Sequence, residues 1–149
     1  MLRIATEEDM PQIMKIEHEA FVPPWSQGGL LYELLSDNSY FLLYEEDDIV
    51  FGFALLRKIG IEGELLQIAV DSRYRRRHVA TDLISEILEH AVDNNLERVF
   101  LEVRESNEAA ISLYKKHGFK YIGRRKNYYI SPTEDSLTMQ RLTDIYQGT

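Results

Sequence analysis

Three arginines and a histidine occupy residues 75–78, shortly after the strand-like stretch LLQIAVDS. An apolar helical pattern begins at residue 79. Strand, basic turn and helix in this order are typical of phosphate sites, because a helix start leaves backbone N–H groups unpaired and carries the positive end of the helix dipole. Guanidinium groups also match phosphate oxygens. The alternative is a solvated, charged first turn of a surface helix, but the dipole disfavours cations there, so the pattern favours anion binding.

Glu102 is the second residue whose side chain could take part in catalysis. The alternation in VFLEVR places Val99, Leu101 and Val103 on one face of a strand and Glu102 on the other. One interpretation is a solvent-facing carboxylate beside a cation. The other is a general base, a partly desolvated carboxylate in a cleft that takes a proton from a reacting group. The residues alone leave both interpretations open.

Tyr114 and Asn107 lie in one helical stretch, residues 106–118. A tyrosine at this spacing is usually a core residue whose hydroxyl bonds to a partner, although a phenol can also donate a proton to a leaving group. Asn107 is a typical helix cap. Both residues are candidates for a site only if other segments meet them in space.

Two aromatic segments complete the candidates. FVPPWS carries Trp25 beside two prolines, which is typical of a rigid packed corner. GRRKNYY combines cations with Tyr128 and Tyr129, a combination that also suits nucleic acid. The net charge of −8 repels phosphate backbones, however, and attracts basic peptides or amines. We therefore expect an exposed strand end or a local recognition loop, and no direct nucleic-acid partner.

Interleaved strands and helices must position these side chains. Their order predicts an α/β layered fold, in which a mixed sheet has helices on both of its faces. The chain shows no internal repeat or linker-like stretch, so one domain over residues 1–149 is expected. The expected strands are 2–5, 39–60 (a hairpin turning at 45–48), 64–70, 98–104, 119–130 and 135–142, and the expected helices are 6–21, 28–35, 79–92 and 106–118.

The composition excludes several classes of site. Cysteine is absent, so disulfides and cysteine-based zinc sites cannot form. The four histidines lack metal-ligand spacing, and we expect no metal. No apolar run approaches the roughly 20 residues of a membrane span, and the N-terminus turns acidic where a signal peptide would be apolar. A cytoplasmic protein without a membrane partner is the resulting expectation.

Taken together, the segments resemble the GNAT superfamily of N-acetyltransferases and, within it, the ribosomal-protein-alanine N-acetyltransferases of the RimI type. The resemblance runs nearly end to end and implies the GNAT fold, with a largely antiparallel central sheet. It is carried, in order, by FVPPWS, LLQIAVDSRYRRRHVATDLI, LEVRESNEAAISLYKKHGF, GRRKNYY and EDSLTM.

This resemblance implies roles for individual residues. Acetyl-CoA would be the co-substrate, Glu102 the general base and Tyr114 the acid that protonates the departing thiolate. Trp25, Tyr128 and Tyr129 would line the groove for an acceptor peptide. The expected cofactor-binding residues are Ile68, Ala69, Val70 and Asn107 along the pantetheine arm, and Arg75, Arg76, Arg77, His78, Val79 and Ala80 around the pyrophosphate.

His78 departs from the family pattern, which has glycine at this position. A left-handed backbone at a histidine costs on the order of 1 kcal/mol. If the backbone of His78 is helical instead, this strain is absent.

The resemblance also implies a reaction. The expected activity is acetylation of a protein N-terminal α-amino group, most specifically the N-terminal alanine of a small-subunit ribosomal protein. One alternative is transfer to another protein N-terminus, a polyamine or a small amine. A second is a ribosome- or RNA-associated binding module with vestigial coenzyme binding, which only RRKNYY favours.

Overall fold

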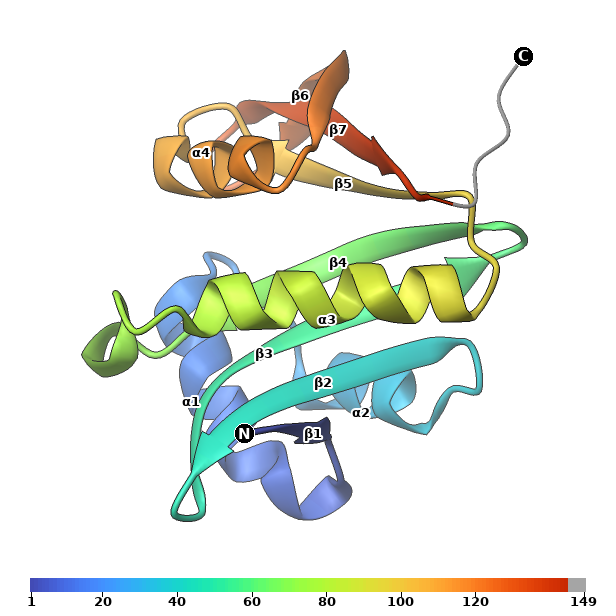
Figure 1. Ribbon diagram of the computed structural model, residues 1–149. Coiled ribbons are helices and arrows are strands. Elements are labelled where there is room, and N and C mark those ends of the chain that lie inside the picture. The colour runs from blue at the N-terminus through green and yellow to red at the C-terminus, as the bar shows by residue number, and fades with distance from the viewer. Residues whose placement is uncertain (145–149) are drawn as a thin grey trace.

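The computed structural model describes residues 1–144 (Figure 1). The expected domain also includes residues 145–149, which lie outside the described residues. The strands are β1 (Leu2–Ile4), β2 (Ser39–Glu46), β3 (Ile49–Ile59), β4 (Glu62–Val70), β5 (Arg98–Arg104), β6 (Lys120–Tyr129) and β7 (Glu134–Leu142). The helices are α1 (Met10–Ala20), α2 (Gln27–Leu35), α3 (Val79–Asp93) and α4 (Glu108–Lys116), with short 3₁₀ turns at Glu7–Asp9 and Ser72–Tyr74.

The strands of the described residues form one sheet in the order β1-β2-β3-β4-β5-β7-β6. All neighbours are antiparallel except β4 and β5, which are parallel and are connected through α3. The prediction of a mixed, largely antiparallel sheet is therefore confirmed.

Helices cover both faces of this sheet, as predicted (Figure 1). The apolar stripe of α3 packs on one face, with Leu83, Ile84 and Ile87 almost fully buried, and α4 adds Tyr114 to the same core. On the opposite face α1 and α2 enclose a second core that contains Ile13 and Leu30. Since α1 and α2 contact β2, β3 and β4, the β5 side of this face is less covered.

The parallel strands β4 and β5 pair over only three rungs. Glu62 opposes Arg98, Gly63 opposes Val99, and Glu64 opposes Phe100. Beyond this junction the two strands diverge, and Figure 1 shows β4 and β5 spreading apart toward the N-terminal ends of α3 and α4. Residues 65–70 of β4 consequently have an edge without a strand partner among the described residues.

A β-bulge lies in β4 immediately beyond the junction. In the ladder with β3, Leu56 pairs with Leu65 and Leu55 pairs with Gln67, which leaves Leu66 as the extra residue. Leu65 belongs to the core under α3, whereas Leu66 packs against the core under α1. Gln67 pairs with Leu55 of that second core, so the bulge turns two successive residues toward the α1 side.

Local signals account for most helix boundaries. The Ser26 hydroxyl accepts the N–H of Gly29 at 3.0 Å and caps α2, and the Asn107 side chain accepts the N–H of Ala110 at 3.2 Å and caps α4. Gly118 follows α4 with φ +86°. The predicted helix cap at Asn107 is confirmed.

Candidate active site

One cavity of about 1230 Å³ lies where β4 and β5 diverge. Its lining contains nearly all of the candidate residues from the sequence. The exception is Arg77, which the structure does not bring to the cavity wall. The cavity is lined by Glu102, Tyr114, Ile68, Ala69, Val70, Arg75, Arg76, His78, Val79, Ala80, Asn107, Trp25, Tyr128 and Tyr129, among others.

The turn before α3 forms one end of this cavity. His78 is the N-cap of α3 with φ +61° and ψ +16°, so the alternative of a helical backbone at this residue is wrong. Arg76 is also left-handed, with φ +66°. The first backbone bond of the helix runs from the Asp82 N–H to the His78 carbonyl, and no side chain of residues 1–144 caps the N–H groups before it. These donors and the helix dipole make the turn suitable for an anion.

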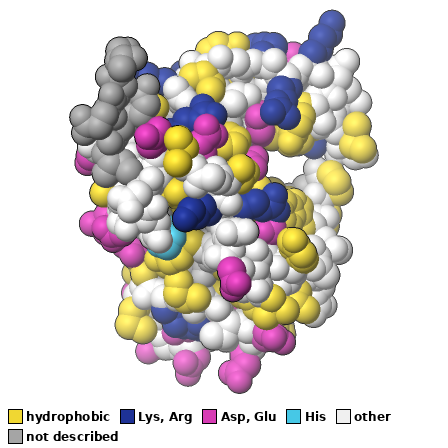
Figure 2. All heavy atoms as spheres, turned by 90° about the vertical axis from the view of Figure 1, so that its right-hand side faces the viewer, with side chains coloured by type: hydrophobic (Ala, Val, Ile, Leu, Met, Phe, Trp, Pro, Cys, Tyr) yellow, Lys and Arg dark blue, Asp and Glu magenta, His cyan; other side chains and the backbone are white. Residues whose placement is uncertain are grey.

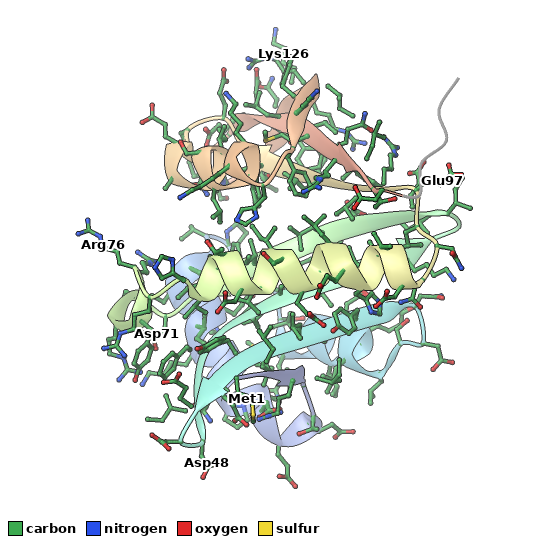
Figure 3. All side chains as sticks on the ribbon, viewed as in Figure 1. Met1, Asp48, Asp71, Arg76, Glu97 and Lys126 are labelled. Carbon is green, nitrogen blue, oxygen red and sulfur yellow. The ribbon has the colours of Figure 1, made fainter. Side chains whose placement is uncertain are left out.

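The arginines of the turn lie in different surroundings. Arg76 extends outward from the turn, as Figure 3 shows. The Arg77 guanidinium lies 5.6 Å from the ring centroid of Tyr74, which itself stacks on Phe51 at 3.8 Å. Arg75 and Arg76 line the cavity, so these two side chains are the cations available to a bound anion.

Gly52 of β3 allows the end of β4 and the start of α3 to approach each other. A Cβ atom at this position would lie 2.7 Å from the Ala69 carbonyl oxygen and 3.2 Å from side-chain atoms of Val70 and Val79. Since real Cβ contacts of 2.7 Å do not occur, only glycine fits beneath this wall of the cavity.

Glu102 projects from β5 on the side of the sheet opposite Leu101, as its alternation predicted. The Ser136 hydroxyl donates to Glu102 Oε2 at 2.5 Å, and the Thr138 hydroxyl donates to the same oxygen at 2.8 Å. Oε1 is buried without a hydrogen bond within the described part of the chain, and Arg125 Nε lies 3.3 Å from it. The carboxylate is therefore fixed through one oxygen, and the other remains available to accept a proton.

Tyr114 is buried beside Phe119 and reaches the cavity from α4. Burial raises the pKa of Tyr114 above its ordinary value of 10.0, and the charge of a nearby Tyr129 phenolate would raise it further. Burial also raises the pKa of Tyr129 to about 12. Both phenols consequently keep their protons at neutral pH and can act as donors.

Arg104 contacts three walls of the cavity, although sequence reasoning did not select it as a site residue. Its guanidinium donates to the carbonyl of Pro132 at 2.9 Å and to the carbonyl of Val22 at 3.2 Å. It also pairs with Glu134 at 3.2 Å and lies 4.4 Å from the ring centroid of Tyr129. These contacts hold the loop between α1 and α2 against the loop between β6 and β7.

A buried polar pair, Glu17 and Gln67, lies behind the same wall. Glu17 of α1 is fully buried and its Oε2 accepts the Trp25 N–H at 2.8 Å and the Gln67 amide N–H at 2.9 Å. Burial raises the pKa of the Glu17 carboxyl. The Oε1 atoms of both residues lack hydrogen-bond partners within residues 1–144. Glu17 lies on the predicted helical stretch, where sequence reasoning gives no sign of a buried carboxylate.

In the face shown in Figure 2, Lys and Arg side chains are interspersed with Asp and Glu rather than gathered in one basic area. Over residues 1–144, no group of three His, Asp or Glu side chains is arranged to hold a metal ion. No helix in the described chain has the length and apolar character required to cross a bilayer.

Comparisons with known proteins show which family this chain resembles. Residues 10–119 match the model of the acetyltransferase (GNAT) family. The [ribosomal protein bS18]-alanine N-acetyltransferase of Haemophilus ducreyi is 33% identical over 133 residues, which cover 89% of this chain and 90% of that protein.

Solved structures show the same fold. The crystal structure of the ribosomal-protein-S18-alanine N-acetyltransferase from Escherichia coli has a TM-score of 0.88 and 27% identity, covering 100% of this chain and 96% of that one. A PaiA N-acetyltransferase from Thermoplasma acidophilum, solved in complex with coenzyme A, has a TM-score of 0.79 and 19% identity, with 95% and 98% covered.

Proposed function

The chain belongs to the GNAT family of acetyltransferases, which use acetyl-CoA, and from this premise we propose that it acetylates the N-terminal α-amino group of a protein. The most specific form of the proposal is the N-terminal alanine of a small-subunit ribosomal protein, because the similar Haemophilus ducreyi protein is named for that reaction. The observation that carries the proposal is the position of Glu102 and the free edge of β4 on one cavity.

The residues fit the donor substrate in two respects. The unpartnered edge at residues 65–70 offers backbone groups to the amides of a pantetheine arm, and the uncapped N–H groups at the start of α3 offer donors to a diphosphate. Arg75 and Arg76 supply cations for the phosphates. The Asn107 side-chain oxygen already accepts the Ala110 N–H and caps α4. We therefore propose that Asn107 lies against the pantetheine arm as part of the cavity wall.

Bound acetyl-CoA supplies an activated acetyl thioester, and the protein supplies proton transfers and position. An α-amino group has a pKa of about 8, so a modest base suffices to produce the neutral nucleophile at neutral pH. We assign that role to Glu102, whose Oε2 is held by two hydroxyls while Oε1 has no hydrogen bond within residues 1–144 and only the Arg125 guanidinium as an ionic neighbour. Tyr114 would protonate the departing thiolate. Holding both substrates in one cavity contributes more than either transfer.

The acceptor side of the cavity suits a peptide end. Trp25, Tyr128 and Tyr129 line it, and Arg104 holds the loop that carries Trp25 against the loop that follows Tyr129. The net charge of −8 favours a basic peptide terminus. The interspersed charges of Figure 2 do not favour the alternative of an RNA-binding module.

A panel of acceptors tests the proposal. Purified protein is incubated with acetyl-CoA and peptides that begin with alanine, serine or proline, together with spermidine and a simple primary amine, while thiol release and product mass are followed. The expected result is fastest acetylation of alanine-starting basic peptides at the α-amino group. Acetylation of spermidine with no peptide product would contradict it.

A further inference from the structure

The amide of Gln67 has a fixed orientation. Glu17 Oε2 is an acceptor, so the Gln67 atom that faces it at 2.9 Å must be the N–H₂ group. The Gln67 carbonyl oxygen is therefore the group left over. It is buried, Gln67 is only 6% exposed, and this oxygen has no hydrogen-bond partner within the described residues. A buried acceptor without a partner is costly, which suggests that a donor arrives from outside the chain.

Gln67 lies on the same cavity as the proposed base, Glu102. If the parallel pairing had continued past Glu64 and Phe100, residue 66 would oppose Glu102. The bulge at Leu66 turns Gln67 to the α1 side, which is also the side from which Glu102 projects. Both residues line the same cavity, immediately beyond the junction of β4 and β5.

We propose that Gln67 binds the acceptor, with its amide oxygen accepting an N–H of the incoming amine, and that Glu17 is the positioning residue that holds this amide. The inference rests on the proposed transfer to an amine. Any amine acceptor brings N–H donors into the cavity, and one of them meets the unpartnered oxygen while the nitrogen lone pair stays free to react. Through the Trp25 N–H, Glu17 also fixes the neighbouring acceptor wall.

The Gln67→Met variant tests the binding role. Methionine keeps the length of the side chain and removes the amide. We expect the acceptor KM to rise about 3- to 30-fold, the effect of one buried hydrogen bond, with the acetyl-CoA KM within about twofold of the parent. Gln12→Met is the matched control, because Gln12 lies near the start of α1 and bonds the backbone of Val50 and Asp48 at the β2–β3 turn. It should lower the melting temperature and leave both KM values unchanged.

Glu17 is tested by comparing two substitutions. Glu17→Met removes both acceptor contacts and should raise the acceptor KM as Gln67→Met does. Glu17→Gln should recover most of the loss, since its amide oxygen still accepts from Trp25 and Gln67. A Gln67→Met acceptor KM equal to that of Gln12→Met, or an equal rise for both substrates, would overturn the inference and leave Gln67 a structural residue.

The test of Gln67 does not depend on the acceptor being a protein N-terminus. The acceptor used is whichever peptide or amine of the panel the parent enzyme acetylates best, so loss of the peptide assignment does not remove the test. Calorimetric titration of that acceptor into parent and Gln67→Met gives the same comparison without turnover. Weaker binding to the variant supports the inference, and equal binding refutes it.

Discussion

At the residue scale, the two oxygens of Glu102 differ in their surroundings, and this difference supports a general base. Ser136 and Thr138 donate to Oε2, whereas Oε1 has no hydrogen bond among residues 1–144. The alternation in VFLEVR predicted the face of Glu102 but not these donors. They come from β7, 34 and 36 residues along the chain, and no local pattern encodes such a contact.

Glu102→Gln should lower kcat about 100-fold at pH 7, within the usual range for loss of a general base. The deficit should shrink as the pH rises past ~8, because a larger fraction of the α-amine is then neutral without assistance. Initial rates of thiol release between pH 6.5 and 9.5 measure both effects. A parent-like rate over this whole interval would remove Glu102 from the mechanism.

Tyr114→Phe should reduce kcat on the order of 10- to 100-fold, because the thiolate loses its proton donor, and the acetyl-CoA KM should stay within about twofold. Burial raises the pKa of Tyr114 above 10.0, so the parent phenol keeps its proton and kcat should show no decline from this group below pH 10. A pH–rate profile of both proteins measures the outcome. If kcat of the parent fell near pH 8 and this fall disappeared in the variant, the pKa of Tyr114 would be lowered and not raised.

His78→Gly should bind acetyl-CoA as well as the parent or better. The left-handed backbone at φ +61° suits glycine, while glycine also has more freedom to lose on folding. The free energy of unfolding should therefore change by less than about 1 kcal/mol. Glu89→Gly, at an exposed position inside α3, is the control and should lose about 1 kcal/mol. A tenfold loss of affinity in calorimetry would instead give the imidazole a direct contact.

At the element scale, the sequence predicted the parts of the fold that depend on neighbouring residues. Ser26 and Asn107 mark helix starts because a cap needs only the next three residues. The bulge at Leu66 was not predicted, since LLQIAV reads as an uninterrupted strand. The positive φ of Arg76 was also missed, because arginine carries no signal for that conformation.

Gly52→Ala should affect two elements at once. The added methyl would meet the Ala69 carbonyl oxygen at 2.7 Å, so the end of β4 or the start of α3 must shift. We expect a loss of about 1–3 kcal/mol in the free energy of unfolding and a raised acetyl-CoA KM. Gly123→Ala is the control, because its Cβ meets nothing within 4 Å. Denaturant unfolding measures the stability, and acetyl-CoA titration measures the KM. If Gly52→Ala matched the parent in both, as Gly123→Ala should, the prediction would be contradicted.

At the scale of the whole molecule, composition and the order of motifs were enough to predict the layers of the fold and the family. The Glu17–Gln67 pair was not predicted, because the cavity forms only when residues far apart in sequence meet. Glu17 and Gln67 are 50 positions apart, and Arg104 reaches the Val22 carbonyl across 82. Such contacts follow from the topology and not from any periodicity.

The net charge of −8 gives a prediction about salt. For a basic alanine-starting peptide, kcat/KM should fall several-fold between about 20 and 200 mM NaCl, because screening weakens the attraction. A neutral peptide of equal length should show little change. Equal salt sensitivity of the two peptides in steady-state assays would contradict electrostatic attraction of the acceptor.

The short junction of β4 and β5 has a consequence for the shape of any molecule that enters. At the third rung the gap between the strands is one sheet spacing, about 4.8 Å, and it grows steadily toward the helix starts. A wedge-shaped opening of this kind selects ligand segments by their width. A slender, unbranched tail can slide to the apex, while a bulky charged head must remain at the broad rim.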